Sequence, residues 1–272
     1  MIGVECLLPT HCYALDIYDA PPAPPGLFFS DYPLYYTADK TTDKDGDTAI
    51  NDLGLRSYQN LFRLTYSTKS LFNKNTFVFD AILPVGRVEI LGESEEGLGD
   101  ILTIFGYYFI DEPKSGTYFA PAFYIDVPTG EYDKGRTVNL GSNVWQFRPA
   151  LFFSKYHKRM NYDIALKYTM YTENSDTKVR SGNEIILETL LGYSIKLSLV
   201  LAAHLDATWG DDAEVDGHRL DDSGVQVYKS GVSLDWALDE KTFLDFKYLR
   251  EFNTKNTPEG DLFQVRFSIK LW

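Results

Sequence analysis

The sequence predicts an all-β chain that closes into an up-and-down, antiparallel transmembrane β-barrel of about 12 strands. Three observations lead to this prediction. Stretches of alternating apolar and polar residues recur along the chain, the connections between them alternate between short and long, and large aromatic residues gather on the apolar faces. Alternation with a period of two is typical of a strand, because successive side chains point to opposite sides of the sheet.

Composition agrees with a protein made of many strands and turns. The 272 residues include 19 Tyr, 18 Phe, 20 Gly and 12 Pro, and the mean hydropathy is −0.23. No stretch approaches the roughly 20 consecutive apolar residues that a membrane-spanning helix needs. The formal net charge of −13 argues against nucleic-acid binding, since contacts to phosphates need a basic surface.

The first 26 residues differ in character from the rest. Residues 1–14 resemble the end of a secretory signal peptide, with small residues before a cut after Ala14, but they lack a basic start; an ordinary disordered terminus is the alternative. Residues 15–26 contain four prolines and are expected to form a stiff periplasmic segment of polyproline type. Residues 27–272 are expected to form the barrel as a single domain.

The alternation defines the expected strands. In residues 160–171, for example, one face is apolar and aromatic, whereas the other contains Asp163 and Lys167. Longer hydrophilic loops are expected at 38–54, 87–98, 128–142, 172–183, 210–224 and 253–260, with short turns between them. The strands are expected around 27–37, 55–67, 75–86, 99–110, 117–127, 143–155, 160–171, 184–194, 197–209, 225–236, 242–252 and 261–272.

The apolar faces are expected to point outward into lipid. Closure of the sheet removes the unpaired backbone edge that hydrocarbon cannot solvate. A soluble lipocalin-like barrel or β-sandwich is the alternative, but a soluble barrel places its apolar residues inside. Aromatic residues near strand ends are typical of the girdles at membrane interfaces. The candidates are Tyr66, Tyr107, Tyr168, Trp209, Trp236, Tyr248 and Trp272.

The opposite faces carry charges of both signs and are expected to line the lumen. Such charges either border an aqueous path that orients a dipolar solute, or pair with one another and fill a closed barrel. Apolar residues such as Leu61, Ile104, Tyr124 and Phe152 share the inward parity and favour passage of an amphipathic molecule. The lumen-lining candidates are Arg63, Asp80, Asp126, Arg148, Asp163, Lys167, Glu184, Glu188, His204, Asp206, Lys229, Asp235, Asp245, Lys247, Arg266 and Lys270.

Three central stretches carry a family resemblance. They are GLGDILTIFGYYF at 97–109, YIDVPTGEYDKG at 124–135 and NLGSNVWQFRPALFFSKY at 139–156. In this order and spacing they resemble the outer-membrane β-barrel family of the MetA pathway of phenol degradation, over roughly residues 54–272. The resemblance implies a bacterial outer-membrane channel for hydrophobic or aromatic compounds. It carries over no ligand-binding residue.

Catalysis and metal binding are not expected, and no cofactor is implied. A barrel phospholipase needs a Ser two residues after its His, but His204 is followed by Leu205 and Asp206, so these two polar residues are interpreted as inner-wall hydrogen-bond partners. The acidic loop at 41–52 lacks the spacing of an EF-hand, and the loop at 209–222 contains six carboxylates. Divalent cations that bridge them to lipopolysaccharide are one alternative, and solvated loops are the other.

The sequence therefore favours a passive outer-membrane channel for small, amphipathic or aromatic solutes. A non-transporting structural or adhesive barrel that holds a periplasmic or surface partner is the alternative, and a lipid-modifying enzyme is the third. The expected partners are outer-membrane lipid, lipopolysaccharide, the solute and the barrel-assembly machinery, for which the aromatic C-terminus is a signal. Long loops are expected outside the cell, and short turns and both termini in the periplasm. Trp272 has inward parity, so either the strand bends before it or Leu271 is the recognised residue.

Overall fold

This computed structural model describes residues 15–16, 19–70 and 75–272, and these residues form strands and their connections. Among them, no helix is long and apolar enough to cross a membrane. The strands are β1 (Gly26–Thr42), β2 (Thr48–Lys69), β3 (Thr76–Ile90), β4 (Glu93–Leu98), β5 (Ile101–Tyr107), β6 (Ile110–Glu112), β7 (Thr117–Val127), β8 (Gln146–His157), β9 (Met160–Tyr171), β10 (Val179–Arg180), β11 (Glu184–Lys196), β12 (Leu199–Gly210), β13 (Glu214–Val215), β14 (His218–Arg219), β15 (Gln226–Ala237), β16 (Thr242–Lys255) and β17 (Pro258–Lys270).

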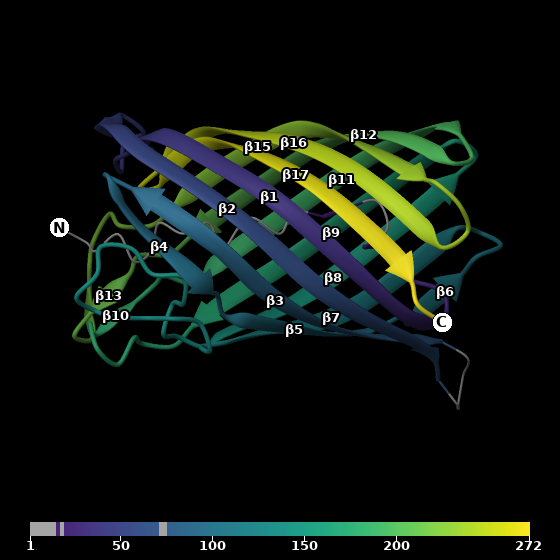
Figure 1. Cartoon of the computed structure of the whole chain (residues 1–272), viewed down its shortest axis with the longest axis horizontal. Helices are drawn as coiled ribbons and strands as arrows, with labels where there is room; N and C mark the ends of the chain where they lie inside the picture. Colours follow the sequence, from purple (N-terminus) through teal and green to yellow (C-terminus); the bar gives the residue numbers. More distant parts are fainter. Residues whose placement is uncertain (1–14, 17–18, 71–74) are drawn as a thin grey trace.

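Twelve of these strands form one closed antiparallel barrel (Figure 1). Around the barrel they run β1, β2, β3, β5, β7, β8, β9, β11, β12, β15, β16 and β17, and β17 returns to pair with β1. At this closing seam Phe28 lies opposite Lys270 and Tyr36 lies opposite Leu262. The remaining short strands extend the rims: β4 pairs with β3, β6 pairs with β7, and β10, β13 and β14 form a small separate sheet. The predicted fold class is confirmed.

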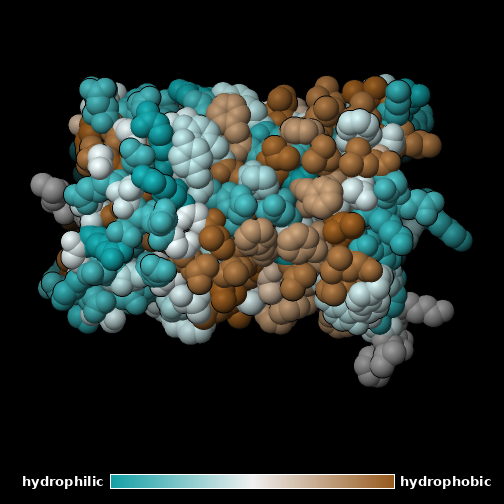
Figure 2. All heavy atoms as spheres, viewed as in Figure 1, coloured by the Kyte–Doolittle hydropathy of each residue, from teal (hydrophilic) through white to brown (hydrophobic). Residues whose placement is uncertain are grey.

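The distribution of burial is the inverse of that in a soluble barrel. On β9, Asp163, Ala165 and Lys167 are buried, whereas Ile164 and Leu166 are exposed. Figure 2 shows hydrophobic residues gathered in a broad zone of the barrel surface between two hydrophilic ends. An apolar outer surface of this extent suits lipid and would be unfavourable in water. The alternation in the sequence therefore encodes a barrel that faces lipid outside and polar groups inside.

The hairpins at the long-loop end extend further than the sequence predicted. β2 has 22 residues and β1 has 17, which exceeds the roughly 9 to 11 residues of a membrane-crossing strand. The expected loops at 38–54 and 253–260 are therefore mostly strand, and part of 87–98 forms β4. Cross-strand contacts continue past the apolar zone, where the Thr42 hydroxyl donates to Thr254 Oγ1 at 3.0 Å. Backbone pairing between β1 and β2 continues as far as Thr42 and Thr48, so the end of the alternating apolar pattern did not mark the end of the strands.

The N-terminal segment requires a correction. The sequence predicted that residues 15–26 form a periplasmic segment, but the described part of it lies inside the barrel. Leu15 and Asp16 are each 2% exposed, and Ala20 is 1% exposed. At one rim the segment emerges beside the last strand, where the Lys270 ammonium donates to the Pro25 carbonyl at 2.9 Å. The proposed signal-peptide remnant at 1–14 lies outside the described residues.

The C-terminus resolves the question raised by the parity of Trp272. β17 ends at Lys270, so Trp272 no longer follows the alternation of the strand. Its ring is exposed and lies 6.0 Å from the ring of Tyr66 on the outer surface, between the ring centroids. The backbone N–H of Leu27 donates to the Trp272 carbonyl at 3.2 Å and ties the end of the chain to the start of β1. The chain therefore turns its last side chain toward the outside.

Candidate lumen site

The residues predicted to line the lumen lie on the inner side of their strands. All of them except Arg63 and Lys270 are buried, and these two are half-buried with polar partners inside the barrel. Several of the charges form ion pairs with residues of neighbouring strands. Lys167 Nζ lies 2.6 Å from Glu188 Oε2, and Arg148 Nη2 lies 3.5 Å from Asp126 Oδ2. Pairing between adjacent strands, which was one of the two interpretations of these charges, is therefore extensive.

One inner residue should have been found from the pattern alone. Glu251 shares the parity of Asp245 and Lys247 on β16 and is buried. It accepts a hydrogen bond from the Tyr36 hydroxyl at 2.7 Å and lies 3.5 Å from Lys229 Nζ. The alternation within the strand expected at 242–252 places this residue on the inner face, but it was not included among the lumen-lining candidates.

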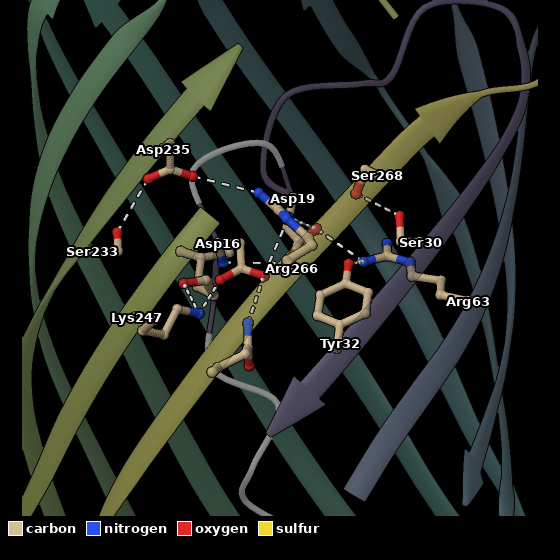
Figure 3. A network of polar contacts seen from close by, with 12 residues as sticks. Asp16, Asp19, Ser30, Tyr32, Arg63, Ser233, Asp235, Lys247, Arg266 and Ser268 are labelled. Carbon is tan, nitrogen blue, oxygen red and sulfur yellow. Dashed lines mark hydrogen bonds and ion pairs between the residues drawn. The ribbon is translucent and has the colours of Figure 1, made fainter. Parts of the chain in front are cut away.

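The N-terminal segment brings two further carboxylates into the lumen (Figure 3). Asp16 forms ion pairs with the Lys247 ammonium and with Arg266, whose Nη1 lies 3.2 Å from Asp16 Oδ2. Asp19 Oδ1 accepts a hydrogen bond from Arg63 Nη1 at 3.0 Å and lies 3.7 Å from Arg266 Nη1. Sequence reasoning missed both acids, because a proline-rich segment has no periodicity that reveals its orientation.

The three cations that meet this segment are held by the barrel wall. Arg63 makes a bidentate contact with Asp80, with both N–O distances at 2.9 Å, and Arg266 Nη2 lies 3.4 Å from Asp235 Oδ1. Lys247 is fully buried and also donates to the Leu15 carbonyl at 3.2 Å. Bidentate arginine pairs fix the direction of the guanidinium group. The remaining N–H groups of Arg63 therefore point to a defined place inside the lumen.

The wall across from this charged cluster is apolar and aromatic. This part of the wall includes residues that were predicted to form the apolar inner face. It borders one cavity of about 90 Å³, and Leu15, Asp16 and Asp19 of the N-terminal segment border the same cavity. A second cavity of about 220 Å³ lies along residues 21–24. For comparison, an apolar cavity of about 150 Å³ holds one benzene molecule, and a water takes about 30 Å³. The apolar wall comprises Leu61, Ile82, Leu102, Ile104, Ala120, Tyr124 and Phe152.

His204 has a partner that the sequence did not reveal. Its Nε2 lies 2.9 Å from the Ser233 hydroxyl on the neighbouring strand β15, and Ser233 also donates to Asp235 at 3.2 Å. The His204–Asp206 contact expected from the sequence is not among the hydrogen bonds of the described residues; Asp206 instead accepts from the Thr189 backbone N–H at 3.2 Å. His204 Nδ1 is buried without a hydrogen-bond partner in the described chain. A catalytic dyad needs a group that orients this nitrogen, so the arrangement lacks that element.

The two acidic loops at 41–52 and 209–222 use their carboxylates for local structure. Asp43 accepts hydrogen bonds from the backbone N–H groups of Asp45 and Asp47 at 3.0 and 2.9 Å. Asp212 accepts from Arg219 at 2.8 and 2.6 Å, and this hydrogen bond lowers the pKa of the Asp212 carboxyl below its ordinary value. Across the described ranges, no group of three or more metal-ligating side chains comes together.

The predicted interface aromatics all lie on the outer side of the barrel. Tyr66, Tyr107, Trp236 and Trp272 lie near strand ends at the rim of short turns, and Tyr168 and Trp209 lie near the opposite ends of their strands. Tyr248 differs, because it lies in the middle of β16. It belongs to a row of outward rings that crosses four strands, with neighbouring centroids 4.7 to 6.3 Å apart. The row consists of Tyr248, Phe263, Tyr35 and Tyr58.

The three motif stretches meet at the rim with the long loops. Asp100 accepts hydrogen bonds from the backbone N–H groups of Gly130 and Ser142, each at 2.8 Å, and from the Ser142 hydroxyl at 2.6 Å. Gly130 and Gly141 are in such close contact that a Cβ on Gly130 would lie 2.7 Å from the Gly141 Cα. The motifs therefore bring segments of loop backbone together around the carboxylate of Asp100.

We expect Asp100→Ala to loosen this packing of the loop backbone without opening the barrel. Hydrogen bonds to a charged group contribute about 1.5 to 3 kcal/mol each, and two buried backbone donors would lose their acceptor. Limited proteolysis of barrels in outer-membrane vesicles should show faster cutting within residues 128–145 than in the natural chain. Asp100→Asn, which keeps an acceptor oxygen, should be cut at an intermediate rate. Equal rates for all three proteins would contradict this role.

Comparison with known proteins now places the chain in a family. The family model described as putative MetA-pathway of phenol degradation matches residues 38–267. The chain belongs to this family. The resemblance of the central motifs is thereby confirmed, and the match extends over most of the barrel. No curated protein matches the chain in sequence.

Solved structures give the same fold for this MetA-pathway family member. The COG4313 outer membrane channel from Pseudomonas putida F1 is 21% identical over 94% of this chain and 99% of its own, with a TM-score of 0.87. The NanC porin is 10% identical over 89% of this chain and 100% of its own, with a TM-score of 0.52. The beta domain of the Bordetella autotransporter BrkA has a TM-score of 0.50 at 9% identity, over 90% and 99% of the two chains. All three are outer-membrane barrels by fold.

Proposed function

We propose that this chain is an integral outer-membrane channel through which small amphipathic or aromatic solutes diffuse passively. The observation that supports this proposal most directly is the division of the inner wall. One part carries the aliphatic and aromatic side chains around Leu102 and Tyr124, and the other carries buried charges such as Lys247 and Arg266. A solute with an apolar body and a polar group has a suitable surface for each end. The candidate residues of the lumen act by lining this path.

The N-terminal segment sets the width of the path in this proposal. Leu15, Asp16 and Asp19 border both the apolar wall and the cationic cluster, and the cavity that they leave is about 90 Å³. That volume holds about three waters, and it is smaller than the cavity that encloses benzene. Passage of an aromatic solute therefore requires the segment to move aside. The barrel would conduct poorly while the segment is in place.

The orientation in the membrane follows the usual arrangement of bacterial barrels. Long loops face the outside, and short turns and the C-terminus face the periplasm. The outward apolar zone contacts lipid, the rim loops meet lipopolysaccharide, and the exposed aromatic terminus at Trp272 is available to the assembly machinery. Protease protection of the short turns in intact cells, compared with lysed cells, tests this orientation.

Planar-bilayer recordings and liposome swelling test the channel function. Purified barrel should give ion conductance, and liposomes that contain it should take up phenyl glucoside, a neutral amphipathic solute, faster than a sugar of similar size without the ring. The matched vesicles without protein correct for direct permeation through lipid. A barrel that folds, resists denaturation by SDS at low temperature and yet passes neither ions nor solute would contradict the proposal.

That result would favour the second candidate, a closed structural or adhesive barrel. The extensive pairing of inner charges, such as Lys167 with Glu188, is the observation that supports it. Catalysis ranks third, because the Ser233–His204 contact lacks an orienting partner at His204 Nδ1 within the described chain. Retention of full solute uptake by a His204→Ala variant would agree with the channel.

A further inference from the structure

Inside the barrel, three cations converge on two carboxylates that do not belong to its wall. Lys247, Arg266 and Arg63 come from β16, β17 and β2, whereas Asp16 and Asp19 come from the N-terminal segment (Figure 3). The side chains of Lys247 and Arg266 are 0% and 5% exposed. This is a built anion site, because the wall fixes the cations and the segment supplies the anions.

The segment presents an apolar group next to its carboxylate. Leu15 is buried in the same cluster as Leu61, Leu102 and Tyr124 of the apolar wall. Directly after it in the chain, Asp16 reaches the opposite side and meets Lys247 and Arg266. Leu15 and Asp16 together therefore have the shape of a small amphipathic carboxylic acid that spans the two parts of the inner wall.

Movement of the N-terminal segment out of the lumen has a free-energy cost, and another anion can offset it. Lys247 and Arg266 would lose their contacts with Asp16. The Arg266 guanidinium would retain its contact with Asp235 at 3.4 Å. Loss of one partner from a buried ion pair is unfavourable, because each cation then has fewer anionic partners in a medium of low polarity. A solute that brings its own carboxylate to this place is therefore favoured over a neutral solute of the same shape.

We propose that Asp16 and Asp19 act as an internal substitute for the solute, and that the natural solutes of the channel are amphipathic monocarboxylates that bind at Lys247, Arg266 and Arg63. The proposal rests on the proposed channel function and narrows its solute class. The apolar body of the acid lies against the wall of Leu61, Leu102 and Tyr124, and its carboxylate takes the place of Asp16.

Benzoate and benzyl alcohol are matched probes, because they share the ring and differ in charge. Both would be added during single-channel recording of Asp16→Asn/Asp19→Asn barrels, in which the internal carboxylates are gone. Benzoate should interrupt the ion current at concentrations at least tenfold lower than benzyl alcohol does. Lys247→Met in the same background should remove most of this difference, whereas Lys247→Arg should keep it. Arg219→Gln in an outer loop is the control and should leave the block by benzoate unchanged.

The outcomes separate the two proposals. Ion conductance without any preference for benzoate would overturn the solute class and leave the channel function intact. Equal block by benzoate in Lys247→Met and Lys247→Arg barrels would overturn the assignment of Lys247 to the site. Absence of conductance in every barrel would overturn both. If Lys247→Met does not fold, the comparison of benzoate with benzyl alcohol in the parent background still decides the solute class.

Discussion

Replacement of Asp16 and Asp19 with asparagine is expected to raise the ion conductance of the barrel several-fold. Asparagine keeps the size of each side chain, but it removes the charge that meets Lys247, Arg266 and Arg63. Removal of one partner from a buried ion pair costs about 3 to 5 kcal/mol. Because about 1.4 kcal/mol is a tenfold change in an equilibrium constant, this cost is large enough to shift the segment out of the lumen. Single-channel recording in planar bilayers measures the change directly.

Asp39→Asn is a matched control for this experiment. Asp39 is an exposed residue near the end of β1 that leads into residues 43–47, and its substitution removes one carboxylate charge without a place in the lumen, whereas the double variant loses two. Its conductance should equal that of the natural chain. An equal conductance of the double variant and the natural chain would mean that the two carboxylates do not hold the segment in place.

Lys167→Met is expected to destabilise the folded barrel by about 3 to 5 kcal/mol. Lys167 and Glu188 are nearly fully buried, with side chains 5% and 6% exposed, and their charged atoms lie 2.6 Å apart. Methionine retains most of the volume but leaves Glu188 without this partner. Equilibrium unfolding in urea in the presence of lipid vesicles should show the loss as a lower midpoint.

A second substitution distinguishes charge from packing in this pair. Lys167→Met/Glu188→Leu removes both charges and should recover much of the stability, because an apolar pair of similar volume often matches a buried ion pair. Lys44→Met in the exposed β1–β2 turn removes a surface lysine next to Asp45 and should leave the midpoint of unfolding nearly unchanged, because water screens exposed ion pairs. A double variant that is less stable than Lys167→Met would contradict this account of the pair.

The strands of the barrel could be predicted from the sequence because one physical signal governs them. In β9 the inward positions are polar apart from Ala165, and the outward positions are aliphatic or aromatic, since lipid lies on one side and the lumen on the other. The signal weakened where the strands leave the membrane. At the start of β2, Thr48 to Asp52 are exposed on both faces, so their polarity no longer alternates and the strand was mistaken for a loop.

The candidate site could be predicted only in part for a different reason. Parity places Lys247 and Arg266 inside, but it does not say which charges meet. The Ser233–His204 contact depends on the register between β12 and β15, which the sequence does not specify. The position of Asp16 depends on the fit of an irregular segment to the completed barrel. Such long-range fit has no local pattern, and only the folded chain reveals it.

Cysteine accessibility tests most directly whether the lumen is a path that the N-terminal segment narrows. Ala122 borders the inner cavity, and Ala81 lies on the outward side of β3, so Ala122→Cys and Ala81→Cys are a matched pair. Both would be made with Cys6→Ser and Cys12→Ser, and treated with a charged methanethiosulfonate reagent during recording. The account predicts a stepwise fall in current for Ala122→Cys only, with faster reaction after Asp16→Asn/Asp19→Asn. An unchanged current for Ala122→Cys in both backgrounds would contradict it.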